Sequence, residues 1–195
     1  MDQPHATASV PIRGRDPMHP DGQYSKPAKW FHWLTVPLLG FSILSGLVIK
    51  YIDEKYKFGF YQLHESTGLI ILTVASARLA WRLYSPPPRH PDHLPPKIRL
   101  AAATVHHLLY AVLILQPLLG FFATNAFGFP LRGQTAFLGF IDLPKFMETN
   151  EALANTLLPI HRVIGWSLPF LLATHVCGAV YHHAFRKDGT LLRML

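Results

Sequence analysis

The segment HRVIGWSLPFLLATH, residues 161–175, decides the fold of this chain. It begins and ends with histidine, and the residues between the two histidines are mostly apolar. An α-helix turns about 100° and rises about 1.5 Å per residue, so the two imidazoles lie roughly 21 Å apart and within about 40° of one face. Ionisable residues at membrane depth are costly and usually functional. The segment therefore predicts a transmembrane helix with one nitrogen ligand near each side of a bilayer.

Three further apolar runs have the length of a membrane span. Together with the first, they cover residues 33–51, 63–83, 100–123 and 157–185. About 20 residues suffice to cross a hydrocarbon layer about 30 Å thick. Only 15% of the 195 residues are charged, against about 25% in soluble domains. The sequence therefore predicts an all-α fold, an integral membrane four-helix bundle in contact with the lipid bilayer.

The basic residues predict the topology of this bundle. The net charge is +7, but the Lys and Arg residues flank the spans and form no stripe, which excludes nucleic acid as the expected partner. Eleven of them lie in the N-terminal tail, the second loop and the C-terminal segment, against five in the first and third loops. By the positive-inside rule, we expect both termini in the cytoplasm.

The segments outside the spans divide the chain further. Residues 1–23 are polar, without the apolar core of a signal peptide, and are predicted to be a mobile cytoplasmic tail; residues 24–195 form the membrane domain. Cys177 is the only cysteine, so the chain has no intramolecular disulfide and no CxxCH motif for covalent haem attachment. The aromatic-rich residues 124–156 are expected to form short helical turns in the membrane interface.

Two more histidines open two other spans, and depth pairs them with the first two. With the N-terminus inside, His32 and His175 lie near the cytoplasmic side, and His64 and His161 near the opposite side. Each pair joins two helices, as a flat macrocycle clamped between them requires. Zinc would need about four ligands around one point, and copper redox sites favour Cys or Met, whereas every methionine lies outside the spans. We therefore predict two stacked haems with these four histidines as axial ligands.

Other ionisable residues allow two interpretations each. His182 lies two helical turns beyond His175 and either lines a pocket beside the inner haem or is an ordinary interfacial histidine. Arg162 follows an outer ligand and either pairs with a haem propionate or snorkels to the head groups. Arg78 is interpreted as a topology anchor. Each histidine alone is more often a packed or interfacial residue than a ligand, so the haem hypothesis depends on the four together.

Several segments resemble those of the bacterial cytochrome b561 family, and the resemblance covers residues 24–195 through their combined spacing. These segments are KWFHW (29–33), HESTG (64–68) with Arg78, HHLLY (106–110) leading to PLLG (117–120), and HHAFRKDGTLLRM (182–194), together with His161 and His175. The family implies a protein of the bacterial inner membrane with two non-covalent haem b groups. Its ligand positions fall on His32, His64, His161 and His175.

The resemblance also implies an activity. The best understood member type is a superoxide oxidase, an oxidoreductase that takes an electron from periplasmic superoxide and reduces ubiquinone near the cytoplasmic side. By this resemblance, His182 falls on a quinone-contacting position, and His106 is a second candidate contact. Two alternatives stay open. One is a cytochrome subunit that relays electrons between quinone and a periplasmic partner enzyme of the hydrogenase type; the other is a haem-free bundle that relays protons or binds a transported ion.

Overall fold

Four long helices make up most of the protein. The computed structural model describes residues 22–88, 94–128, 136–144 and 146–195, so residues 1–21 of the predicted tail lie outside the described residues. The helices are α1 (Lys26–Val48), α2 (Glu54–Tyr84), α3 (Pro96–Ala126) and α4 (Glu151–Tyr181). A 3-10 turn, η1 (Ile49–Tyr51), follows α1, and a π-helical turn, η3 (His182–Arg186), follows α4. The all-α prediction with four helices is confirmed.

Local capping explains where two of these helices begin. Asp53 Oδ1 accepts a hydrogen bond from the backbone N of Lys55 (3.0 Å) at the start of α2. Asn150 Oδ1 accepts one from the backbone N of Leu153 (3.0 Å) at the start of α4. Because a side-chain cap satisfies amides that lack a helical partner, α4 begins at Glu151, ahead of the apolar run at 157–185. The helix therefore begins six residues before the predicted apolar run.

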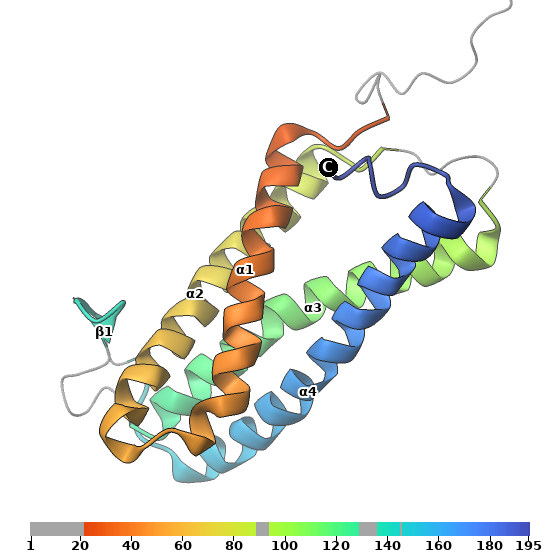
Figure 1. The fold of residues 1–195 in the computed structure, drawn as a ribbon. Helices are drawn as coiled ribbons and strands as arrows, with labels where there is room; N and C mark the ends of the chain where they lie inside the picture. Colours follow the sequence, from red (N-terminus) through yellow and green to blue (C-terminus); the bar gives the residue numbers. More distant parts are fainter. Residues whose placement is uncertain (1–21, 89–93, 129–135, 145) are drawn as a thin grey trace, which may run out of the picture.

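The helices pack in chain order, and the residues just before α1 contact the C-terminal segment. α1 packs on α2, α2 on α3 and α3 on α4, whereas α1 and α4 contact each other sparsely (Figure 1). The backbone N of Tyr24 donates to the carbonyl O of Arg193 (3.1 Å), and Arg193 Nε donates to the carbonyl O of Gly22 (2.7 Å). We call the end of the bundle where Gly22 and Tyr24 contact Arg193 the terminal end. The opposite end, which contains the α1–α2 turn, is the distal end.

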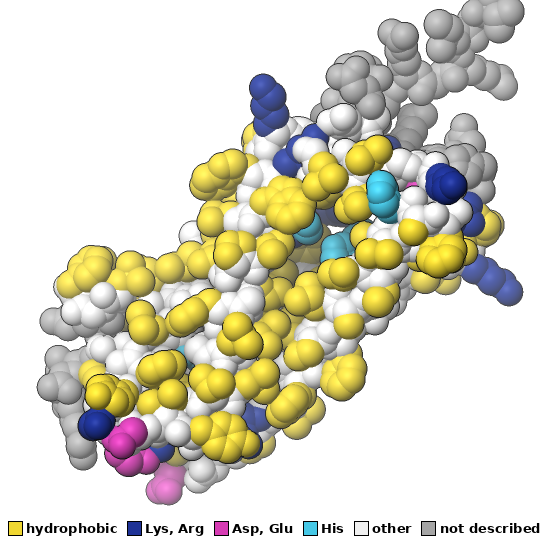
Figure 2. Space-filling view, viewed as in Figure 1, with side chains coloured by type: hydrophobic (Ala, Val, Ile, Leu, Met, Phe, Trp, Pro, Cys, Tyr) yellow, Lys and Arg dark blue, Asp and Glu magenta, His cyan; other side chains and the backbone are white. Residues whose placement is uncertain are grey.

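Three of the helices are long and apolar enough to cross a membrane. They cover Lys26–Tyr51, Pro96–Ala126 and Glu151–Arg186. α2 has a similar length, but Glu65, Arg78 and Arg82 lower its hydropathy. Large apolar side chains are exposed around the bundle, and Figure 2 shows hydrophobic atoms over most of the visible side. An outward apolar surface of this extent is the one that lipid solvates.

An apolar layer lies midway along the bundle, with contributions from all four helices. Its buried residues are Leu39, Ile71, Ala75, Leu113 and Leu168. Four of them follow a candidate histidine by seven residues: Leu39 follows His32, Ile71 follows His64, Leu113 follows His106 and Leu168 follows His161. Seven residues are about two helical turns. The layer therefore separates the histidines of the terminal end from those of the distal end.

The segment after α3 contains a small hairpin instead of helical turns. The strands β1 (Ala136–Phe137) and β2 (Ile141–Asp142) pair antiparallel, with Phe137 opposite Ile141. Leu138 and Gly139 have positive φ (56° and 84°), which a helix does not permit. The prediction of helical turns is therefore wrong for residues 136–142, while residues 129–135 and 145 lie outside the described residues. The backbone N of Leu138 donates to Ser66 Oγ (2.9 Å) and fixes the hairpin on α2.

Candidate functional site

His32 of α1 and His175 of α4 face each other near the terminal end. Their ring centroids are 6.1 Å apart, with an interplanar angle of 67°. His32 Nδ1 is buried and has no hydrogen-bond partner among the described residues. A buried ring nitrogen without a partner is costly unless a ligand satisfies it. His106 of α3 joins this pair, since its ring centroid lies 5.3 Å from that of His175.

His64 of α2 and His161 of α4 form a second pair toward the distal end. Their ring centroids are 6.3 Å apart, with an interplanar angle of 86°. The predicted grouping by depth therefore matches the contacts that the helices make. Among the described residues, no three His, Cys, Asp or Glu side chains gather into a metal-binding group. The four candidate ligands thus lie in two pairs, and each pair joins two helices.

Hydrogen bonds orient both rings of the second pair. His161 Nδ1 donates to the carbonyl O of Gln116 (3.0 Å), and Gln116 Nε2 donates to the carbonyl O of His161 (2.8 Å). The Ser45 hydroxyl donates to the carbonyl O of Ser42 (3.1 Å), which leaves Ser45 Oγ to accept a bond from His64 Nδ1 (2.8 Å). With Nδ1 engaged, Nε2 of each ring is the nitrogen available to a metal. Ser45 and Gln116 were not among the predicted site residues.

Two glycines leave room for these imidazoles. A Cβ atom at Gly120 would lie 2.9 Å from His161 Cε1, and one at Gly46 would lie 3.1 Å from His64 Cε1. A third, Gly165, serves Gln116, because a Cβ atom there would lie 2.8 Å from Gln116 Nε2. The close approach of α3 to the His161 ring therefore depends on the absence of a side chain at Gly120. A Cβ atom at Gly46 would require a smaller shift of its neighbour, and one at Gly165 would meet only the end of the flexible Gln116 side chain.

The spacing within each pair fits one metal between two imidazoles. Each metal–nitrogen bond is about 2 Å long and each ring centre lies about 1 Å beyond its nitrogen, which places the two ring centres about 6 Å apart. Figure 2 shows histidine side chains in a hollow between α1 and α4 toward the terminal end. Since α1 and α4 contact each other sparsely, a flat group has space between them. The residues present therefore fit a haem, whose iron takes two axial ligands.

The candidate quinone contact His182 is held by a buried carboxylate. Asp188 accepts hydrogen bonds from His182 Nδ1 (2.6 Å), Arg186 Nε (3.3 Å), Thr190 Oγ1 (2.6 Å) and the backbone N of Thr190 (3.1 Å). Burial opposes ionisation of this carboxyl, but the bonds from Thr190 and His182 hold the pKa of Asp188 below its ordinary value. His182 is thereby fixed with Nδ1 engaged and Nε2 free to bind another group.

We expect Asp188→Asn to lower thermal stability at neutral pH, with a smaller effect in acid. The folded-state pKa of Asp188 is lower than its unfolded value of about 4. The ionised carboxylate therefore stabilises the folded chain fully above the unfolded pKa, and this contribution is lost as the pH falls toward the folded pKa. The test compares melting temperatures of the two proteins by circular dichroism between pH 7 and pH 3. An equal difference throughout would contradict the expectation.

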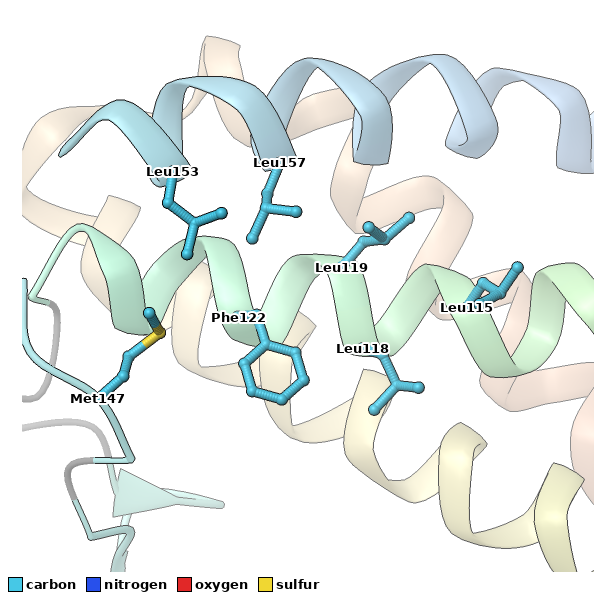
Figure 3. A pocket seen from close by; sticks show the side chains of 7 residues that line it. All are labelled: Leu115, Leu118, Leu119, Phe122, Met147, Leu153 and Leu157. Atoms are coloured by element: carbon cyan, nitrogen blue, oxygen red, sulfur yellow. The ribbon is translucent and has the colours of Figure 1, made fainter. Parts of the chain in front are cut away.

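A separate apolar pocket lies between α3 and α4 toward the distal end (Figure 3). Its volume is about 410 Å³, and it is lined by Leu115, Leu118, Leu119, Phe122, Met147, Leu153 and Leu157. None of these lining side chains is charged, and Met147 is the one among them that has a potential metal-binding atom, its thioether sulfur. Arg162, the candidate anion partner, is exposed on α4 beside His161. Neither feature alters the assignment of the two histidine pairs as the candidate site.

Comparison with known proteins identifies the family. Residues 23–195 match the family model described as prokaryotic cytochrome b561. Cytochrome b561 homolog 2 of Escherichia coli is 31% identical over 169 residues, covering 85% of this chain and 87% of that protein. Cytochrome b561 homolog 1 of the same organism is 30% identical over 183 residues (89% and 97%). A protein of Yersinia pestis named probable superoxide oxidase CybB is 28% identical over 165 residues (84% and 90%).

The match to the family model covers the four helices and both histidine pairs. A family of helical membrane proteins agrees with the bundle and its apolar surface. The chain belongs to the prokaryotic cytochrome b561 family, a family of membrane electron-transfer proteins that bind b-type haem.

Proposed function

We propose that this chain is a di-haem cytochrome that oxidises superoxide on one side of the bacterial inner membrane and reduces ubiquinone on the other. The carrying observation is the presence of two imidazole pairs, with ring centroids 6.1 and 6.3 Å apart, on either side of one apolar layer. A relative named probable superoxide oxidase supports the choice of superoxide as electron donor.

Under this proposal, each pair holds one haem b. His32 and His175 would be the axial ligands at the terminal end, and His64 and His161 at the distal end. Haem b would supply one-electron oxidation and reduction at an iron without an open coordination position. Ser45 and Gln116 keep Nδ1 of the distal ligands engaged, so that Nε2 stays the coordinating atom.

The proposed reaction runs from the distal end to the terminal end of the bundle. Superoxide would give its electron at the distal end and leave as oxygen, and ubiquinone would accept electrons at the terminal end. Two superoxide ions and two protons are needed for each ubiquinol formed. The apolar layer of Leu39, Ile71 and Leu168 keeps water and protons out of the region between the two pairs.

His182 is the proposed quinone contact, and Asp188 positions it. Because Asp188 accepts from Nδ1 (2.6 Å), Nε2 of His182 would face a quinone carbonyl. His106, 5.3 Å from His175 by ring centroids, would line the other side of this site. We expect His182→Ala to slow ubiquinol formation about tenfold, the effect of one lost hydrogen bond, and to leave reduction of the protein by superoxide unchanged. Stopped-flow spectroscopy tests this expectation by measuring the reduction of the protein by superoxide and its reoxidation by ubiquinone separately.

The proposed orientation places both termini in the cytoplasm. Figure 2 shows most of the visible Lys and Arg side chains at the terminal end and the visible acidic side chains at the distal end. Retention of basic residues on the cytoplasmic side is the usual pattern of inner-membrane proteins. Reporter fusions at each loop would test this orientation.

The function is tested by mixing the purified protein with superoxide and ubiquinone. We expect rapid reduction of the b-type spectrum by superoxide, followed by formation of ubiquinol. A matched control is His64→Ala, which should lose the rapid reduction by superoxide. A protein that superoxide does not reduce, but that copurifies with a periplasmic redox enzyme and is reduced by it, would instead be an electron-relay subunit. Absence of a Soret band would favour the haem-free alternative.

A further inference from the structure

Arg78 is a largely buried cation of α2 that no described acidic residue neutralises. The ion pairs among the described residues involve Lys57, His182 and Arg186 as the basic partners. The groups that act on the charge of Arg78 include Tyr110, Tyr24 and a second cation, Arg82. An uncompensated charge inside a membrane bundle is costly, and in membrane proteins such a residue usually has a functional partner. An anion at this position would compensate the charge of Arg78.

The position of Arg78 on α2 repeats the histidine spacing of α4. His64 and Arg78 are fourteen residues apart, as are His161 and His175. α2 and α4 run in the same direction, and His64 and His161 form the distal pair. Arg78 thus lies at the depth of His175, on the face of α2 that carries His64. Its charge interacts with both His32 and His175.

A second guanidinium lies beside the first on the same aromatic ring. Arg78 Cζ is 5.4 Å and Arg82 Cζ is 5.8 Å from the ring centroid of Tyr110. Tyr110 follows His106 by one helical turn on α3, and the His106 ring contacts that of His175. Stacking on an aromatic ring fixes a guanidinium in place, and its planar fork binds carboxylates through two parallel hydrogen bonds.

We propose that Arg78 and Arg82 bind the propionate carboxylates of the haem at the His32–His175 pair. The inference rests on the proposed function, since it requires a haem at this pair. Haem b has two propionates, so two cations match its charge, and a carboxylate matches the fork of each guanidinium. Tyr110 acts as the positioning residue between them. Arg78 is then a cofactor-binding residue, which differs from the interpretation of this residue as a topology anchor.

The test uses the complete haem-containing protein and four variants. Arg78→Gln removes the charge and the fork, Arg78→Lys keeps the charge only, and Arg82→Gln tests the second cation. Arg99→Gln is the control, because Arg99 is an exposed cation at the same end of the bundle. The readouts are the propionate-bending band in resonance Raman spectra and the two steps of a spectroelectrochemical redox titration.

We expect Arg78→Gln to shift the propionate band and to move one redox step to lower potential, because loss of a nearby cation disfavours electron uptake. The other step should stay unchanged. Arg78→Lys should shift the band with a smaller change in potential, and Arg99→Gln should change neither. If the Arg78→Gln protein does not assemble with haem, the propionate band and the potentials of Arg78→Lys and Arg82→Gln test the inference instead.

Three outcomes would overturn the inference. In the first, the band and both potentials do not respond to any change at Arg78 or Arg82. In the second, both redox steps shift equally, which indicates a general field. In the third, Arg78→Gln loses bound phospholipid, measured as phosphorus, while the band stays in place; the anion is then a lipid phosphate. Failure of the di-haem part of the proposed function would look different, since the unaltered protein would then give a single redox step or none.

Discussion

Replacing His64 by alanine is expected to halve the haem content of the protein, from two haems per chain to one. His64 and His161 face each other at 6.3 Å between ring centroids, so each would supply one of the two axial bonds at the same iron. A haem held by a single imidazole loses most of its affinity, and the remaining haem at the His32–His175 pair should keep its spectrum. Pyridine haemochrome analysis against protein concentration measures the ratio.

Double variants sharpen this expectation into a test of the pairing. His64→Ala combined with His161→Ala should lose no more haem than either change alone, because both act at one site. His64→Ala combined with His175→Ala should lose both haems. His183→Ala is the matched control, since His183 lies outside both pairs in η3 and should leave both haems in place. The opposite result would contradict the pairing: both haems lost in the His64/His161 double variant, and one haem lost in the His64/His175 double variant.

Gly120→Ala is expected to release the distal haem, although it removes no ligand. The new Cβ atom would lie 2.9 Å from His161 Cε1 and 3.1 Å from His161 Nδ1, distances that real Cβ atoms rarely show. The imidazole must therefore move, and the hydrogen bond from Nδ1 to the carbonyl O of Gln116 breaks. Loss of such a supporting bond weakens binding at a metal site by about 10- to 100-fold.

The control for this variant is Gly40→Ala. A Cβ atom at Gly40 of α1 meets nothing within 4 Å, so the change should leave both haems bound. Because alanine is the better helix former, it should also raise the stability of α1 by about 0.5–1 kcal/mol. Haem content and the midpoint of thermal unfolding separate the two variants. Retention of both haems with an unchanged spectrum in Gly120→Ala would contradict the role assigned to this glycine.

Helical register made much of the architecture predictable. The fourteen-residue spacing of His161 and His175 needs only helix geometry to place two imidazoles on one face, and the lengths of the apolar runs define the helices. α2 was harder, because its hydropathy is lowered by residues that face the interior, among them Glu65 and Arg78. Its predicted helix depended on length and on the flanking charges.

The supporting residues of the site were not predicted, because their role lies in contacts between distant segments. Gln116 is a polar residue in an otherwise apolar run, a signal that could have marked it. Its partner, the carbonyl O of His161, is 45 positions away, and no pattern along the chain shows such a contact. Ser45 is similar: its bond to His64 Nδ1 exists only because α1 packs on α2. The hairpin at 136–142 was missed for the same reason, since Ser66 of α2 fixes it.

The most direct measurement is the number and ligation of haems in the unaltered protein. The molar ratio of haem to protein, with the protein quantified by amino-acid analysis, gives the number. Near-infrared magnetic circular dichroism identifies the axial ligands of each low-spin iron. The account predicts two haems per chain, each with two imidazole ligands. One haem per chain, or iron bound by a side chain other than histidine, would contradict it.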